Sequence, residues 1–153
     1  MYVAIIVIFS FISNINTLSN GFVWDDIQQV INNRWITDII YLKSIFTENV
    51  AGFVPGSSTS YYRPLMYVFY MAVYGVFGLE SWGWHLINLL VHIGVVIVLF
   101  LLTKRLLSQT DTASNQTAYR ISFAAALMFA VHPIHTEAVA WVGALPELTY
   151  TLF

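Results

Sequence analysis

Residues Trp84–Leu102 read WHLINLLVHIGVVIVLFLL, a run without Asp, Glu, Lys or Arg that ends just before Lys104-Arg105. A helix needs about 20 apolar residues to cross the hydrocarbon core of a bilayer, and this run has nearly that length. Residues 83–105 are therefore predicted to form a membrane-spanning helix. The fold class of the chain depends on this segment more than on any other.

The composition of the whole chain agrees with a membrane location. Hydrophobic residues make up 58% of the sequence, charged residues 9%, and the mean hydropathy is +0.71. A soluble domain carries about 25% charged residues, so the bilayer is the expected solvent and intrinsic disorder is excluded. The net charge of −2 gives no electrostatic basis for binding nucleic acid. The absence of cysteine excludes disulfides, thiolate catalysis and cysteine metal sites.

The apolar segments on either side predict an all-α integral membrane protein with a long outer loop. Spans are predicted at about 1–18, 83–105, 118–133 and 138–153. Residues 19–80 are predicted to form the outer loop with interfacial helices, one of them after Asp38. The residues expected on its apolar face are Ile39, Ile40, Leu42, Ile45 and Phe46.

The basic residues favour one topology. If Pro64–Leu79 lies in the interface and does not span, Lys104, Arg105 and Arg120 become cytoplasmic, as the positive-inside rule requires. The outer loop and the segment His132–Glu137 then share the outer side. Gly52–Ser60 and Ser108–Thr117 are predicted loops from their small and polar residues.

Two adjacent acids follow the first apolar segment, in the stretch Gly21–Asn33, GFVWDDIQQVINN. One interpretation is helix capping, because Asp25 and Asp26 each have a Gln three residues later. The other interpretation is a catalytic or metal-binding role. Adjacent carboxylates repel each other, which raises the pKa of one of them, and a raised pKa suits a general base. The two interpretations are compatible, since one Asp can cap while its neighbour reacts.

Three further polar groups stand out, and each has a structural and a functional interpretation. Arg63 either reaches lipid headgroups or binds a substrate phosphate. The second group either marks a membrane boundary or forms a catalytic or metal-binding loop; it comprises His132, His135 and Glu137. The third shares one helical face and either packs helices or is functional; it comprises His85, Asn88 and His92.

These motifs together resemble a known family. FVWDD with a following INN, YYRPL, WGWHLINLLVH and FAVHPIHTEAVAWV occur here in the order they take in the transmembrane O-mannosyltransferases that target cadherins. Bacterial and archaeal membrane proteins with tetratricopeptide repeats share the pattern. The resemblance extends from about Asn16 to Phe153. No tetratricopeptide repeat is present in this sequence, so the resemblance is to the N-terminal part of such an enzyme.

The resemblance implies a helical bundle of the GT-C type and an inverting glycosyltransferase. Such an enzyme moves a sugar, here mannose, from a polyprenyl-phosphate carrier to a Ser or Thr hydroxyl of an acceptor protein. Asp25 and Asp26 match the family's acidic motif, and Asp26 is slightly preferred as the base. Arg63 lies where relatives place a basic residue for the carrier phosphate, and His135 and Glu137 match the second outer loop.

The resemblance leaves several points open. Relatives carry an Arg shortly after HPIHTEAV, whereas this chain has none between Trp141 and Glu147. The cofactor is unknown; if a divalent metal is used, its candidate ligands are Asp25, Asp26, His135 and Glu137. The expected location is a bacterial or archaeal cytoplasmic membrane, or the endoplasmic reticulum of a eukaryote, with membrane lipids as neighbours. The alternatives are an inactive fragment of such an enzyme and a non-enzymatic membrane scaffold or transporter module in which the polar clusters are structural.

Overall fold

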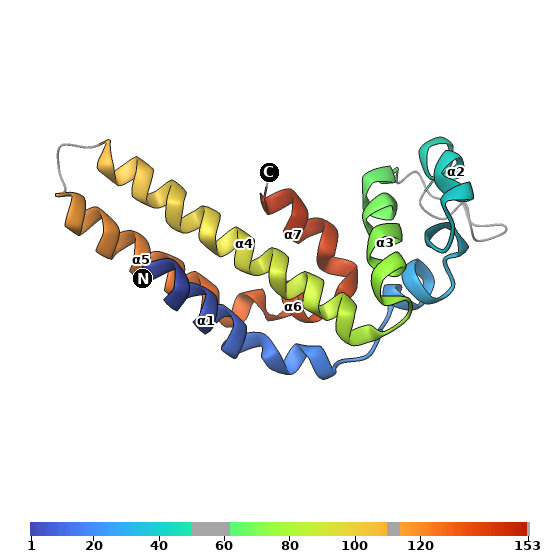
Figure 1. The fold of residues 1–153 in the computed structure, drawn as a ribbon, viewed down its shortest axis with the longest axis horizontal. Helices are drawn as coiled ribbons and strands as arrows, with labels where there is room; N and C mark the ends of the chain where they lie inside the picture. Colours follow the sequence, from blue (N-terminus) through green and yellow to red (C-terminus); the bar gives the residue numbers. More distant parts are fainter. Residues whose placement is uncertain (50–61, 110–113, 153) are drawn as a thin grey trace. The chain divides into compact units, whose positions relative to one another are not determined.

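The computed structural model describes residues 1–49, 62–109 and 114–152, and in these ranges it contains helices and no strands. The all-α prediction is confirmed. The predicted loop Gly52–Ser60 lies outside the described residues, as do Tyr61 and part of the loop Ser108–Thr117. The α-helices are α1 (Tyr2–Asn14), α2 (Leu42–Thr47), α3 (Pro64–Phe77), α4 (Ser81–Ser108), α5 (Asn115–Val131), α6 (Thr136–Ala140) and α7 (Leu145–Leu152) (Figure 1).

Shorter helical turns connect these helices. One of them, η2 (Ile27–Ile31), is a π turn, in which the Asn32 amide donates to the Ile27 carbonyl at 2.9 Å. The remaining turns are of the 3₁₀ type: η1 (Ile15–Ser19), η3 (Arg34–Ile36), η4 (Ile39–Tyr41), η5 (Pro133–His135) and η6 (Val142–Ala144).

The chain is an integral membrane protein. Helix α1 continued by η1 gives one candidate span of 18 residues, and α4 gives another of 28 residues. Helix α5 and the segment Pro133–Ala140 satisfy the same criteria only as a pair, which is bent by 50° at the break between them and forms either a broken span or a re-entrant loop. The bend falls at Pro133, whose ring removes a backbone donor and interrupts the helix. The residues expected as a fourth span, up to Leu152, hold the end of α6, η6 and α7.

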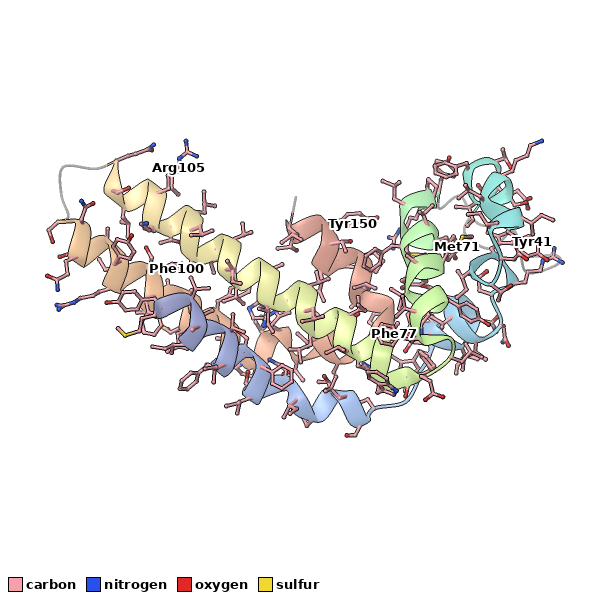
Figure 2. All side chains as sticks on the ribbon, in the orientation of Figure 1. Tyr41, Met71, Phe77, Phe100, Arg105 and Tyr150 are labelled. Atoms are coloured by element: carbon pink, nitrogen blue, oxygen red, sulfur yellow. The ribbon has the colours of Figure 1, made fainter. Side chains whose placement is uncertain are left out.

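The first compact unit comprises residues Met1–Asn20 and His85–Phe153. Within it α1 and α5 run in the same direction and α4 runs opposite to both (Figure 1). Phe100 of α4 points toward α5 (Figure 2), with its ring centroid 6.5 Å from that of Tyr119. The buried core between these helices consists of Ile6, Val96, Phe100, Ala126 and Ala130.

Hydroxyl groups inside this unit bond to their own helices. Ser10 Oγ donates to the Ile6 carbonyl at 2.8 Å, and Ser122 Oγ donates to the Ala118 carbonyl at 2.8 Å. Lipid offers no partner for such groups, so a bond within the helix is the available solution.

The second compact unit is Gly21–Trp84. A short helical segment begins after Asp38, as predicted, because Asp38 Oδ1 accepts the Ile40 amide at 2.9 Å and caps η4. Its expected apolar face is divided: Ile45 is buried, whereas Ile39 and Ile40 are exposed, because a 3₁₀ turn precedes α2 and changes the angular spacing. Pro64 opens α3, and Gly78, with φ of +57°, ends it.

Candidate functional site

A tight turn holds the acidic pair in the second unit. The Val23 amide donates to Asp26 Oδ2 at 3.0 Å, and the Asp26 amide donates to the Val23 carbonyl at 3.0 Å. Trp24 between them has a φ of +48°. This Val23–Asp26 turn gives the two carboxylates different surroundings: the Asp26 side chain is 0% exposed, while Asp25 is exposed.

The turn also decides how Asp26 relates to the following helix. Asp26 occupies the N-cap position of η2, but its side chain makes no capping hydrogen bond there. Its carboxylate bonds backward to the Val23 amide instead, so the forward capping box expected with Gln29 is not formed. Two other residues of this unit do cap the turns that follow them. The side-chain oxygen of Asn33 accepts the Trp35 amide at the start of η3, and that of Asp38 accepts the Ile40 amide at the start of η4, both at 2.9 Å.

Arg63 lies at the N-cap position of α3 and is partly buried. Tyr67, one helical turn later, is buried to 1% exposure. Burial raises the pKa of the Tyr67 hydroxyl above its usual range, and the positive charge of Arg63 acts in the opposite direction. The Tyr67 phenol therefore stays neutral.

A chain of edge-to-face aromatic rings connects the acidic turn with α3. Ring centroids of successive members lie 5.3 to 6.1 Å apart, with interplanar angles of 70° to 86°. Each such pair contributes about 0.5–1.5 kcal/mol beyond its buried area. We name this set the aromatic ladder; its members in order are Phe22, Trp84, Tyr70, Tyr67 and Trp35.

The aromatic ladder gives the candidate residues of this unit a common support. Phe22 immediately precedes the Val23–Asp26 turn, and Tyr67 lies one turn from Arg63. The ladder was not predicted from the sequence. Two features of the sequence could have indicated it: Tyr67 and Tyr70 lie on one face of a helix, and aromatic residues make up 16% of the chain.

The predicted polar face of α4 lies inside the first unit, where His85, Asn88 and His92 are all buried. Asn88 Nδ2 donates to the Trp141 carbonyl at 2.7 Å and to the Val139 carbonyl at 3.4 Å. These bonds join α4 to backbone carbonyls at the break after α6. A role in helix packing accounts for these contacts of Asn88.

The three candidate residues of the second predicted loop, His132, His135 and Glu137, lie in η5 or within two residues of it. His132 is exposed, and its Nδ1 accepts the Ile134 amide at 3.2 Å; Glu137 is exposed in the first turn of α6. His135 is partly buried, and its ring centroid lies 4.0 Å from that of Phe129. It also lies 5.9 Å from the ring of His92, a residue that the sequence placed in a separate polar group.

His92 therefore joins the two polar groups of the first unit. Its Nε2 lies 3.4 Å from the carbonyl oxygen of Ala130, near the end of α5, and its ring stacks on Phe129 at 6.1 Å. His92 thus contacts the end of α5 and His135 at once. The structure brings His92 and His135 together, which spacing along the sequence could not show.

The candidate metal ligands are divided between the two units. Asp25 and Asp26 belong to the second unit, and His135 and Glu137 to the first. Among the described residues, no group of three or more His, Cys, Asp or Glu side chains is arranged to hold a metal ion. A metal role for these four residues remains a prediction.

Comparisons with known proteins agree with the motif pattern. The chain is 32% identical over 151 residues to a protein O-mannosyl-transferase of Caenorhabditis elegans, covering 97% of this chain and 21% of the relative. It is 36% identical over 140 residues to protein O-mannosyl-transferase TMTC3 of Mus musculus, covering 90% of this chain and 14% of the relative. It is 33% identical over 141 residues to TMTC2 of Mus musculus, covering 91% of this chain and 16% of the relative.

The resemblance inferred from the motifs is thus confirmed over nine tenths of the chain. The chain spans about a fifth or less of the length of these curated relatives. No family model matches the chain, and no solved structure matches it.

Proposed function

We propose, from its likeness to protein O-mannosyl-transferases, that this chain contributes an acidic catalytic turn to a membrane glycosyltransferase of the GT-C type. The proposed donor is a polyprenyl-phosphate mannose, and the proposed acceptor is a Ser or Thr hydroxyl of a protein. The observation that carries the proposal is the Val23–Asp26 turn, which exposes one carboxylate beside a buried one.

The burial of the two acids supports different roles for them. A general base must come within hydrogen-bond distance of the proton it takes. Asp25 is exposed, which leaves its carboxylate accessible to a polypeptide acceptor, whereas Asp26 is 0% exposed and holds the Val23 amide. Asp25 is accordingly the proposed base, in preference to Asp26, and Asp26 is the proposed positioning residue.

The proposed reaction is a single displacement. The Asp25 carboxylate takes the proton of the acceptor hydroxyl as its oxygen attacks the anomeric carbon. The bond from that carbon to the phosphate oxygen breaks, and the phosphate leaves with the bonding electrons. Attack from the face opposite the leaving group inverts the anomeric centre. Arg63, beside a tyrosine that stays neutral, is the group proposed to offset the developing phosphate charge.

Single substitutions in the protein expressed from its complete reading frame test this proposal. We expect Asp25→Asn to lower kcat for mannosyl transfer by about 10²- to 10⁴-fold with little change in folding, because it removes the base and no described structural bond. Asp26→Asn is expected to reduce folded yield as well as activity, because a buried hydrogen-bonded carboxylate is altered. The assay is transfer of radiolabelled mannose from the lipid-linked donor to an acceptor peptide.

Asp38→Asn is the matched control. Asp38 is an exposed acid in the same unit, and Asn replaces Asp well at an N-cap, so neither activity nor folding is expected to change. Transfer that survives both Asp25→Asn and Asp26→Asn would remove the carboxylate role from the proposal.

A non-enzymatic membrane module is the second candidate function. The contacts of Asn88 with backbone carbonyls favour it, because they show a polar cluster acting in helix packing. Wild-type protein that is folded and transfers no sugar from any polyprenyl-phosphate donor would favour this alternative.

A further inference from the structure

Trp24 combines two properties that rarely occur together. Its φ of +48° makes it the one residue other than glycine with a positive φ in the described ranges. Bulky L-residues avoid this region because the side chain crowds the backbone. The Trp24 side chain is nevertheless 76% exposed, so the strained backbone does not serve to bury the indole.

The surrounding turn holds Trp24 in this conformation. The two bonds between Val23 and Asp26 close the turn on either side of it, and the Ile27 amide donates to the Trp24 carbonyl at 3.2 Å. Consecutive Cα atoms are about 3.8 Å apart, so the indole begins one residue from the exposed Asp25. Both side chains are exposed, so both are open to a molecule from outside the turn.

A lipid anchor is the obvious other role for an exposed tryptophan at a membrane interface. An anchor, however, works equally well from an ordinary helical backbone. Trp82 of the same unit is 47% exposed from such a position in α4. Strained residues cluster at ligand clamps and active sites, where a fixed side-chain direction is required. The backbone of Trp24 therefore favours ligand contact over anchoring.

The chemistry of the indole indicates the ligand. The face of an aromatic ring carries excess negative charge, and it attracts the weakly positive C–H groups on one face of a pyranose. We propose that the Trp24 indole binds the donor sugar by stacking on this C–H face, with the anomeric carbon held toward Asp25. This inference rests on the proposed function and adds to it a residue that binds the sugar itself.

Three variants of the protein expressed from its complete reading frame test the inference. Trp24→Asn removes the ring but keeps a residue that tolerates positive φ, so the turn should be retained. Trp24→Tyr keeps an aromatic face. Trp82→Asn removes an exposed tryptophan of the same unit and serves as the matched control. The measurements are KM for polyprenyl-phosphate mannose and KM for the acceptor peptide.

We expect Trp24→Asn to raise the donor KM by about 3- to 10-fold, with an unchanged acceptor KM. Trp24→Tyr and Trp82→Asn should stay within about twofold of wild type. An unchanged donor KM in Trp24→Asn overturns the inference and leaves the proposed function standing. Equal increases of both KM values in Trp24→Asn and Trp82→Asn, without a specific donor effect, assign Trp24 to anchoring and overturn the inference. Folded wild-type protein that transfers no sugar overturns both proposals.

Discussion

Asp25 and Asp26 are chemically identical and adjacent in the chain, yet one is exposed and the other fully buried. The separation arises from the left-handed backbone at Trp24 and the two hydrogen bonds that close the turn. The sequence predicted the importance of the pair from its position in an apolar chain. It could not predict the difference in burial, because a Trp at positive φ contradicts local backbone preference and needs tertiary support.

Among single residues, Arg63 also provides a test, here of the phosphate role. We expect Arg63→Gln to raise the KM for the lipid-phosphate donor by about tenfold or more, because a charge-assisted hydrogen bond contributes about 1.5–3 kcal/mol. Arg63→Lys should recover part of the loss, since it keeps the charge but not the bidentate geometry. Donor titrations at fixed acceptor measure both effects. Equal donor KM values for wild type and Arg63→Gln would assign Arg63 to a structural role at the start of α3.

Among the helices, α5 carries a buried face of small residues at a spacing of four: Ala118, Ser122, Ala126 and Ala130. This spacing lets helices approach closely in a membrane, where packing replaces the hydrophobic effect as the driving force. Ala126 and Ala130 lie in one core cluster with Ile6 of α1 and Val96 of α4. The face thus explains how α5 packs against both neighbours.

That face gives a second test. Ala126 is 0% exposed, so Ala126→Leu should overpack the contact among α1, α4 and α5 and destabilise the protein by about 1–3 kcal/mol. Ala124→Leu, at an exposed position of the same helix, is the matched control and should have little effect. Thermal unfolding in detergent, followed by size-exclusion chromatography with fluorescence detection, measures the difference. Indistinguishable melting of the two variants would contradict this account of the α5 interface.

The elements themselves were predictable to different degrees. Helix α4 is expected from its long apolar run, and the bend after α5 is expected from Pro133. The aromatic ladder cannot be predicted from any local pattern, because Trp35 and Trp84 meet α3 through tertiary contacts and Phe22 joins the ladder through Trp84. Local pattern thus predicts where helices lie and gives little information about which rings support the acidic turn.

Across the molecule, the first unit separates two kinds of polar residue. Lys104 Nζ lies 4.1 Å from the Tyr119 ring centroid, so the basic ends of α4 and α5 lie together. Because α1 and α5 run opposite to α4 (Figure 1), η1 and η5 belong to the other end of this bundle. This arrangement supports the predicted topology, in which the basic end is cytoplasmic and the HPIHTE segment is on the outer side.

Cysteine labelling tests this topology directly, because residues 1–153 contain no cysteine that would add a background signal. We expect Ser19→Cys and Ile134→Cys to react with a membrane-impermeant maleimide added outside, and Ser108→Cys to react only after access to the cytoplasmic side. Sealed vesicles of defined orientation provide the measurement. Labelling of Ser108→Cys and Ile134→Cys from the same side would show that α5 and α6 do not cross the membrane together.

The π turn η2 between Asp26 and Asn32 has a consequence for comparing related genes. A π turn closes its hydrogen bond over five residues instead of four, so it holds one residue more than an α turn. Loss of one codon in Ile27–Ile31 would restore α geometry and turn the preceding acidic turn by about 100° relative to Asn33. A one-residue gap at this point in an alignment therefore marks a change in the direction of Asp25 and Asp26, and it should not be dismissed as an alignment error.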